Sequence, residues 1–434
     1  MSGRRSRVLI HSLEAHRLGD GLGDEMGDGL GNDVLRRLSH RAVLLSRPGD
    51  VVIVDSMPDA RWVEWVSGLL GARGDGIGDG LGEIVVAGGE GETLVDRALS
   101  DRGLLKELGR RIDGDEWDVE PYMGGEGVRA FCTEIGGRFR SPEVRLLDRL
   151  NLKSNLGPVL HEIGLPSVTT TVACRDAVVE VARSMLGKYG ALIVRSDLSI
   201  GGHGVWMVNG ETDLGGDDLH GLALGIKRSS AERLFVISPM LEVTSSPNVQ
   251  YDIGDDGAGL LGVSDQQMTV SFAFGGNAHP SSMGRDPGLL EQGARLGAWL
   301  HGRGYRGMVG IDFIVTVDGE VYVVEINPRV NTSSFPLLLS GRLGCGAFRL
   351  LTGIEPGVVM GFAGVAELLG DGVMFEGGGD GGRGVVPLMV PSGERGVLDV
   401  MVFGETLEEV DGVCAEMDAR LRGRGLNGIG GALQ

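Results

Sequence analysis

Two short apolar runs near position 320 carry side chains of a kind that binds metal ions. The first run, 310–316, contains Asp312, and the second, 320–325, ends at Glu325 and is followed two residues later by Asn327. An Asp-Gly turn between the runs predicts an antiparallel hairpin, which would bring Asp312 near Glu325. Because strand residues alternate in direction, Glu325 and Asn327 point to the same side. Three hard oxygen ligands on one face suit Mg²⁺.

The apolar surroundings of the two carboxylates strengthen this interpretation. Asp312 lies between Ile311 and Phe313, and Glu325 follows a run of apolar, strand-forming residues. An unpaired charge in such surroundings would lose several kcal/mol of hydration, so a cation or a hydrogen-bonding partner is expected. The alternative is a structural ion pair between Glu325 and Arg329, with Asp312 only ending a strand.

An upstream segment has the composition of a phosphate-binding loop. The apolar run 191–195 ends in a cation, Arg195, and a glycine-containing loop follows before the next strand-like run. Glycine lets backbone N–H groups approach phosphate closely, and a guanidinium can neutralise phosphate oxygens. The same loop could equally be an ordinary hairpin turn. Its candidate nucleotide-binding residues are Ser199, Gly201, Gly202 and His203.

The composition indicates an ordered globular protein with an acidic excess. Hydrophobic residues make up 42% of the 434, and the formal net charge is −20. About one domain per 150 residues predicts roughly three packed units. The acidic balance disfavours general attraction to nucleic-acid backbones or anionic lipid, so we expect neither nucleic acid nor membrane as a partner. Lysine occurs only at Lys106, Lys153, Lys188 and Lys227, and the remaining cations are arginines, which suit phosphate or carboxylate.

The cysteines and the start of the chain favour a reduced, soluble protein. Cys132, Cys174, Cys345 and Cys414 are widely separated, without the close spacing of zinc or redox motifs. The N-terminal apolar run, Val8–Ile10, is too short for a signal peptide, and no apolar stretch approaches the length of a membrane span. These features predict a cytoplasmic location.

Strand-like and helix-like runs alternate in the first third of the chain, which predicts a parallel α/β sheet at about residues 1–140. A helix at 143–150 leads onward. Two glycine-aspartate-rich tracts, 18–33 and 74–82, match neither a calcium-binding repeat nor a phosphate loop, and we interpret them as loop insertions. The strand-like runs are 7–10, 51–54 and 83–87, and the helical patterns are 60–70 and 93–108.

The middle of the chain mixes strands and helices, and the last part, about 346–434, carries no motif that indicates a function. The predicted strands of the middle part are 167–173, 191–195, 205–208, 234–238 and 249–253, with less certain strands at 259–274 and helices at 177–188 and 289–302.

The hairpin resembles the C-terminal signature of the ATP-grasp superfamily, in which an acid on one strand and an E-x-N on the next bind two magnesium ions. Here these residues are Asp312 and Glu325-Ile326-Asn327, and Pro328-Arg329 follows as in carbamoyl-phosphate-synthetase-like members. The resemblance implies ATP as the nucleotide and Asp312, Glu325 and Asn327 as ligands of Mg²⁺, for which Mn²⁺ can substitute. Arg329 would contact the transferred phosphoryl group.

The same resemblance implies where the nucleotide lies. Lys153 and Arg195 take the positions of the family's phosphate-binding cations, and residues 199–204 take that of its small glycine loop. The adenine hinge would be formed by Pro239, Met240, Leu241 and Glu242. The chain departs from the usual acidic hinge and ribose residues, and offers Ser238, Glu242 and Asn248 instead.

The order of the parts resembles, more narrowly, the peptide ligases of pheganomycin type. The implied architecture is an α/β protein with α+β subdomains and an ATP-grasp fold: a Rossmann-like pre-ATP-grasp domain at 1–140, two lobes at 141–235 and 236–345, and a small cap at 346–434. The implied reaction is ATP-dependent joining of an amino-acid carboxylate, nonproteinogenic ones included, to the amine of a peptide or amino acid through an acyl phosphate. The alternatives are a carbamoyl-phosphate-type or other carboxylate-phosphorylating enzyme and a catalytically silent nucleotide-binding scaffold.

Residues for the acid and the amine are less specific. Arg306 is a candidate for stabilising the oxyanion beside Arg329, or else a surface cation. The substrate candidates are Gln266, Gln267, Ser271, His279, Ser333 and Ser334, each of which could also be an ordinary polar residue. The expected partners are a small-molecule carboxylate and an amine, and the oligomeric state is open, with a homodimer as one expectation.

Overall fold

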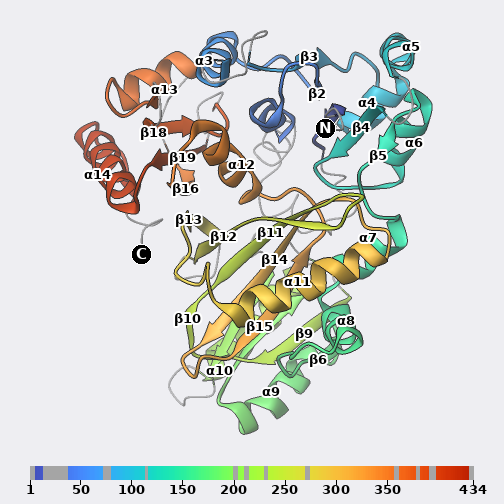
Figure 1. Ribbon diagram of the computed structural model, residues 1–434. Helices are drawn as coiled ribbons and strands as arrows, with labels where there is room; N and C mark the ends of the chain where they lie inside the picture. The colour runs from blue at the N-terminus through green and yellow to red at the C-terminus, as the bar shows by residue number, and fades with distance from the viewer. Residues whose placement is uncertain are drawn as a thin grey trace.

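The computed structural model arranges the chain around one large sheet (Figure 1). The N-terminal domain and the C-terminal region lie side by side at one end, and the middle of the chain forms the other end. The structure describes residues 5–12, 38–71, 80–112, 116–198, 204–209, 215–228, 233–268, 274–355, 361–377, 382–390 and 397–429.

The N-terminal domain is a parallel sheet with the strand order β3-β2-β1-β4-β5, which confirms the predicted α/β sheet. The central strands β1 and β2 are covered by helices on both faces, and their apolar side chains are buried accordingly. The order reverses between β1 and β4, a topological switch point. The elements are β1 Ser6–Ile10, η2 Ala42–Leu45, β2 Val51–Val54, α3 Ala60–Gly71, β3 Glu83–Val86, α4 Leu94–Ser100, α5 Arg102–Arg111, β4 Trp117–Pro121, α6 Glu126–Ile135 and β5 Arg138–Phe139.

Two features of this domain differ from the prediction. The helix predicted at 93–108 is two helices, α4 and α5, because Asp101 ends the first and its carboxylate accepts a hydrogen bond from Leu104 N at 3.0 Å. Strands β4 and β5 were not predicted, since β4 carries acidic residues and β5 is only two residues long. The tract 18–33 lies outside the described residues, as does 74–82 except for its last three residues.

The middle of the chain begins with a small antiparallel lobe with the strand order β6-β9-β7-β8. Helices α9 and α10 pack on it around a core that includes Phe235 and Val194. The predicted strands are present with ends shifted by a few residues. The elements are α7 Val144–Asn151, η4 Lys153–Asn155, α8 Leu156–Ile163, β6 Thr171–Cys174, α9 Val178–Tyr189, β7 Ala191–Ser196, β8 Val205–Asn209, α10 Gly215–Arg228 and β9 Leu234–Pro239.

The large sheet follows, and α11 and α8 cover one of its faces. Its described strands run in the order β10-β14-β11-β12-β13-β16-β19-β18-β17, and β15 pairs with β14. The elements are β10 Val243–Ser245, β11 Pro247–Ile253, β12 Ala258–Met268, β13 Phe274–His279, α11 Pro287–Gly302, β14 Gly307–Thr316, β15 Val321–Asn327, α12 Ser334–Leu343, β16 Ala347–Ile354, α13 Gly361–Leu369, β17 Glu376–Gly377, β18 Gly382–Pro387, β19 Leu398–Gly404 and α14 Leu407–Gly423.

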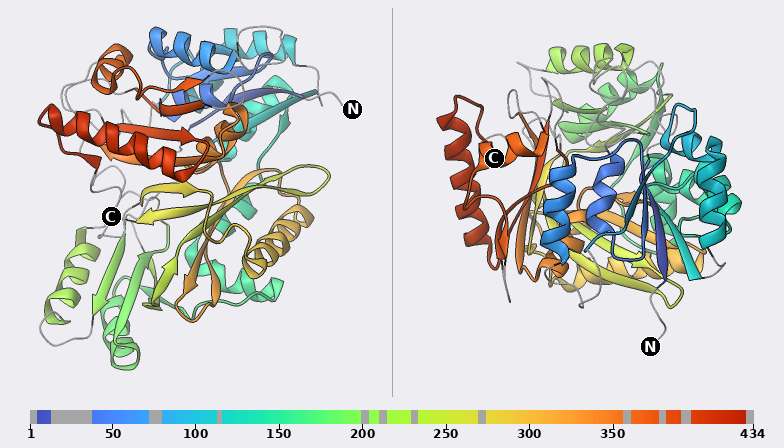
Figure 2. Two further views of the ribbon diagram at one scale, coloured as in Figure 1. Left: turned by 60° about the vertical axis from the view of Figure 1, so that its left-hand side comes forward. Right: turned by 90° about the horizontal axis from the view of Figure 1, so that it is seen from above.

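The C-terminal region extends this sheet rather than forming a separate one. Strand β16 pairs with β13, so the sheet continues across the boundary proposed at residue 345, and α14 lies on the outer side of its last strands (Figure 2). The same region shares a core with the N-terminal domain, in which Trp62 Nε1 donates a hydrogen bond to Pro387 O at 3.3 Å. The two ends of the chain therefore pack as one body.

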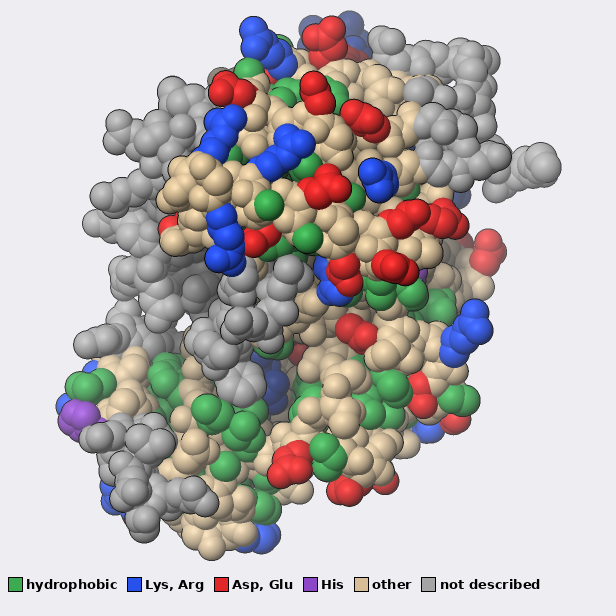
Figure 3. Space-filling model, turned by 90° about the vertical axis from the view of Figure 1, so that its left-hand side faces the viewer, with side chains coloured by type: hydrophobic (Ala, Val, Ile, Leu, Met, Phe, Trp, Pro, Cys, Tyr) green, Lys and Arg blue, Asp and Glu red, His purple; other side chains and the backbone are tan. Residues whose placement is uncertain are grey.

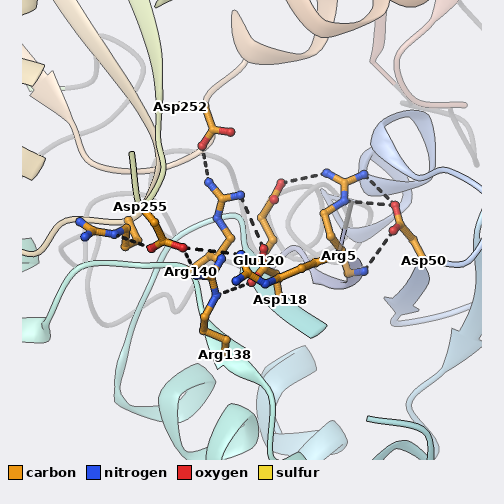
Figure 4. A network of polar contacts seen from close by, with 10 residues as sticks. Arg5, Asp50, Asp118, Glu120, Arg138, Arg140, Asp252 and Asp255 are labelled. Carbon is orange, nitrogen blue, oxygen red and sulfur yellow. Dashed lines mark hydrogen bonds and ion pairs between the residues drawn. The ribbon is translucent and has the colours of Figure 1, made fainter. Parts of the chain in front are cut away.

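A network of ion pairs joins the N-terminal domain to the large sheet (Figure 4). Arg140 pairs with Asp252 at the end of β11, and Arg138 pairs with Asp118 at 2.7 Å and with Asp255. Burial lowers the pKa of Arg140, but the surrounding carboxylates more than offset this and its pKa is raised. Each of these charges has a partner of opposite sign, so the network holds the N-terminal domain against the large sheet.

The described surface carries charges of both signs. On the face shown in Figure 3, acidic and basic side chains are interspersed over the upper half. None of the helices that the structure describes combines the length and the apolar character needed to cross a membrane.

We predict that the ion pair between Arg41 and Asp399 holds the N-terminal domain on the C-terminal region. The Nη2–Oδ2 distance is 2.6 Å and both side chains are about nine-tenths buried. Asp399→Ala should lower the free energy of unfolding by about 3–5 kcal/mol, because it leaves a buried unpaired guanidinium. Denaturant unfolding measures this.

The matched control is Arg183→Ala, which breaks the exposed pair with Glu180 and should change the free energy of unfolding by less than about 1 kcal/mol. Equal effects of the two substitutions would contradict the prediction.

Candidate functional site

The predicted hairpin is present, and it places polar side chains in two rows across the large sheet. Asp312 on β14 lies opposite Glu325 on β15, as the sequence predicted. Strand β11 pairs with β14 on the other side, which adds an amide to each row. Because residues two apart share a face, both rows point the same way. The rows are Glu325–Asp312–Asn248 and Asn327–Gly310–Gln250.

A β-bulge sets the direction of Glu325. The register moves from Asp312 opposite Glu325 to Phe313 opposite Val323, so Val324 has no partner on β14. The carbonyl oxygen of Val324 accepts a hydrogen bond from Arg195 Nη1 at 3.2 Å. The bulge thereby ties the hairpin to β7 of the small lobe.

Three side-chain amides hold the carboxylate of Asp312. Asn248 Nδ2 and Gln266 Nε2 donate to Oδ1 at 2.5 and 2.7 Å, and Asn327 Nδ2 donates to Oδ2 at 2.9 Å. Since the nitrogen of Asn327 is used in this way, its amide oxygen is left as an acceptor. Asp312 is thus fixed in orientation by uncharged donors.

Charge at the hairpin is distributed unequally between the two carboxylates. Burial and the negative charge of Glu325 raise the pKa of Asp312 to about 7. Burial would also raise the pKa of Glu325, but the positive charges of Lys153 and Arg329 more than offset it, and its pKa is lowered. Glu325 is therefore held ionised, while Asp312 takes up a proton near neutral pH.

Three cations from three segments converge on Glu325. Lys153 Nζ lies 3.1 Å from Glu325 Oε1, and Arg195 and Arg329 add positive charge. The Nε atoms of Arg195 and Arg329 are buried and have no hydrogen-bond partner among the described residues. Buried donors without acceptors are costly, so these two guanidinium groups are suited to an anion such as phosphate.

The position of Lys153 depends on Asp197, which follows β7. The Asp197 carboxylate accepts hydrogen bonds from Ser154 N at 2.7 Å and Ser154 Oγ at 2.9 Å, and its carbonyl accepts from Lys153 N at 3.1 Å. The short helix η4, which carries Lys153, is therefore fastened to the end of β7, which carries Arg195. Asp197 was not singled out in the sequence.

These groups line one cavity of about 1150 Å³ between the small lobe and the large sheet. It extends from the hinge after β9, past the hairpin, to Tyr122 of the N-terminal domain. Val330 N donates to Tyr122 O at 2.9 Å, so the segment after Arg329 is attached to that domain. The cavity is large enough for a nucleotide and a further small molecule.

The predicted hinge residues Pro239, Met240, Leu241 and Glu242 line the opposite end of the cavity. Met240 N already donates to Ala191 O at 3.0 Å, and Glu242 O accepts from Val317 N at 3.1 Å. These contacts leave the backbone N–H groups of Leu241 and Glu242 as hinge donors for a planar ring.

Several predicted residues lie elsewhere. Arg306 does not reach the cavity: its Nε lies 3.1 Å from Asp255 in the ion-pair network, which corrects the catalytic interpretation in favour of a surface cation. Ser334 is buried below the cavity lining, whereas Ser333 lines it. The candidates that lie outside the described residues are Ser199, Gly201, Gly202, His203 and Ser271.

Strand direction decides between the polar candidates on β12 and β13. Gln266 lines the cavity, but its neighbour Gln267 is not among the lining residues. His279 contacts Val263 O at 2.7 Å and stacks on Phe348 instead. Tyr122 and Phe274 line the cavity and were missed, because nothing in their local sequence marks them. Asn248, named in the sequence analysis for the hinge and ribose region, lies beside Asp312, and Gln250 was missed although the N-x-Q spacing places it on the same face as Asn248.

The donor set fits a hard divalent cation. Among the described residues, no three His, Cys, Asp or Glu side chains form a metal-binding group, so an ion would depend on Asp312, Glu325 and the amide oxygen of Asn327. Two neighbouring carboxylates and an amide oxygen, with room for water and phosphate, match the ligands that Mg²⁺ takes.

Comparisons with known proteins agree with this geometry. Residues 39–137 match the family model of the pre-ATP-grasp domain, and residues 184–333 match a family model of the ATP-grasp domain. No curated protein matches the chain in sequence.

Solved structures share the fold at low identity. The N5-carboxyaminoimidazole synthetase of Staphylococcus aureus, solved with ADP, is 13% identical with a TM-score of 0.54, over 96% of this chain and 98% of that one. A biotin carboxylase of Campylobacter jejuni, solved with an ATP ligand, is 13% identical with a TM-score of 0.57, over 96% of this chain and 91% of that one. At this identity the likeness shows the fold.

The first family model covers strands β2 to β4 of the N-terminal sheet, and the second covers the hairpin that lines the cavity. The chain thus belongs to the ATP-grasp superfamily, with a pre-ATP-grasp domain ahead of the ATP-grasp domain.

Proposed function

We propose that this protein is a peptide ligase that uses ATP to join an amino-acid carboxylate to the amine of a peptide or amino acid. The observation that carries the proposal is the convergence of Asp312, Glu325 and Asn327 with Lys153, Arg195 and Arg329 in one cavity. The ligase class follows from the family, and the peptide product follows from the resemblance to ligases of pheganomycin type.

The nucleotide would bind with its adenine at Leu241 and its phosphates toward the hairpin. Arg195 and Lys153 would hold phosphate oxygens, which would give the unpartnered Nε of Arg195 an acceptor. Mg²⁺ held by Asp312, Glu325 and Asn327 would neutralise the charge that develops on the phosphoryl oxygens. The carboxylates would in turn lose their mutual repulsion.

In the first step, an oxygen of the substrate carboxylate attacks the γ-phosphorus, and the bond to the β-phosphate oxygen breaks. The products are an acyl phosphate and ADP. Arg329 lies at the end of the cavity nearest Tyr122, so its guanidinium supports the transferred phosphoryl group.

In the second step, the amine nitrogen attacks the acyl carbon, and the bond to the phosphate oxygen breaks. The leaving phosphate takes the amine proton, and an amide remains. Tyr122, Phe274, Thr332 and Ser333 line the end of the cavity beyond Arg329, where the acid and amine would meet. Enclosure there would limit hydrolysis of the acyl phosphate.

We predict that a mass-spectrometric screen of amino acids against amines and short peptides with ATP and Mg²⁺ will give an amide product with stoichiometric ADP. Asp312→Asn and Glu325→Gln should each lower the rate by at least about 10²-fold in a folded protein, since phosphoryl transfer depends on charge neutralisation. Arg306→Ala, outside the cavity, should retain the wild-type rate.

Turnover at wild-type rate in both carboxylate variants would contradict the metal assignment. A phosphorylated acid trapped by hydroxylamine, with no amide from any amine, would favour a carboxylate-phosphorylating enzyme. Nucleotide binding with no ADP released would favour a silent scaffold.

We also predict that Mg²⁺ affinity depends on pH. The pKa of Asp312 is raised to about 7 without metal, so protons compete with Mg²⁺ below that pH. The apparent affinity should be nearly constant above about pH 8 and fall by about tenfold between pH 8 and pH 6. Calorimetric titration of Mg²⁺ into the ADP-bound protein measures this.

Asp312→Asn is the control, because it removes the titrating group and should flatten the dependence after correction for ADP itself. An equal affinity of the wild type at pH 6 and pH 8 would show that Asp312 does not hold the ion.

A further inference from the structure

A hydrogen-bonded row of uncharged side chains, which we call the relay, runs from Asp312 behind the cavity wall to the start of α12. Its centre is Gln250, which is 0% exposed. Gln250 Nε2 donates to Asn248 Oδ1 at 2.7 Å and to Asn331 Oδ1 at 2.8 Å, and Gln250 Oε1 accepts from Ser334 Oγ at 2.9 Å. Gln250 therefore connects residues that belong to two different segments.

One path of hydrogen bonds, from Ser334 to Asp312, keeps a single direction. The hydroxyl of Ser334 donates to Gln250, Gln250 donates to Asn248, and Asn248 Nδ2 donates to Asp312 Oδ1 at 2.5 Å. Donors aligned in this way polarise one another, and the chain ends on a carboxylate, the strongest acceptor in it. This path connects Ser334 to Asp312.

Gly310 provides the space in which the chain lies. It stands between Asn327 and Gln250 in its row, and a Cβ there would lie 2.1 Å from Asn331 Nδ2 and 2.6 Å from Gln250 Nε2. Any side chain at this position would displace the amides. The hydrogen bonds of Gln250 and Asn331 therefore require a glycine at position 310.

The end of the relay farthest from Asp312 belongs to the segment 331–334. This segment lines the part of the cavity where we place the amine, which we call the acceptor side. Asn331 and Ser334 flank Thr332 and Ser333, both of which line the cavity just after Arg329. Asn331 and Ser334 are also bonded to each other, since Ser334 N donates to Asn331 Oδ1 at 3.2 Å. The segment is thus held in one conformation by the same relay that reaches Asp312.

We propose that Gln250 is a positioning residue that joins Asp312 to the segment 331–334, so that the metal-binding carboxylate and the acceptor side of the cavity form one rigid unit. This inference rests on the proposed function, because it assigns Asp312 to a magnesium nucleotide. Gln250 itself does not line the cavity and touches neither substrate.

The test is calorimetric titration of the full chain with ADP, with Mg²⁺ and with EDTA. In the wild type, Mg²⁺ should increase the affinity for ADP. Gln250→Leu should reduce that increase by about tenfold or more, the effect typical of groups that orient metal ligands, and should leave ADP binding in EDTA unchanged. Ser334→Ala should act in the same direction, and the double variant should be no worse than Gln250→Leu.

Gln292→Leu is the matched control. Gln292 on α11 donates to Val321 O at 3.0 Å, outside the relay, so its loss should leave the effect of Mg²⁺ unchanged. Thermal melting reports whether each variant is folded, and Ser334→Ala carries the test alone if Gln250→Leu does not fold.

The outcomes separate the two claims. A wild type that binds ADP more tightly with Mg²⁺, and folded variants that do so equally, would overturn the relay alone. A lower melting temperature with an unchanged effect of Mg²⁺ would also overturn it, because the role would then be only structural. A wild type without any effect of Mg²⁺ would overturn the proposed function and the relay together.

Discussion

The structure depends on two carboxylates that the hairpin of β14 and β15 holds side by side in the wall of the cavity. Asp312 and Glu325 are opposite residues on β14 and β15, and each would be costly there without compensation. Lys153 stabilises the charge of Glu325, whereas Asp312 receives only amide donors, and its pKa rises to about 7. The pair is therefore complete only with a further cation, and this requirement connects the fold to the use of a magnesium nucleotide.

The surrounding parts of the protein supply the cations that the hairpin lacks and hold them in place. The small lobe carries Arg195 and the bend before it carries Lys153, and Asp197 fastens the two together. The N-terminal domain holds the segment after Arg329 through Tyr122, and the C-terminal region extends the large sheet behind it. Cations from separate segments thus reach one carboxylate, because these hydrogen bonds and strand pairings hold the segments in place.

The sequence was sufficient for the elements whose pattern is local. The hairpin, its Asp-Gly turn, the first parallel strands and the shared face of Glu325 and Asn327 each follow from spacing within a few residues. Register between distant strands was not predictable, so Gln250 and Asn248 were not placed beside Asp312. The candidates Gln266 and Gln267 could not be told apart, although Gln266 is the one of the two that lines the cavity. Arg306 was predicted to stabilise the oxyanion, but it pairs with Asp255. Nothing in its local sequence indicated this partner, because Asp255 lies in a distant turn.

The central claim is tested most directly by a crystal structure with a non-hydrolysable ATP analogue and Mn²⁺, recorded at a wavelength that gives anomalous signal from manganese. The account predicts anomalous peaks at about 2.1 Å from oxygens of Asp312, Glu325 and Asn327, with the phosphates against Arg195 and Lys153. A nucleotide bound outside this cavity, or manganese bound without these three side chains, would contradict it.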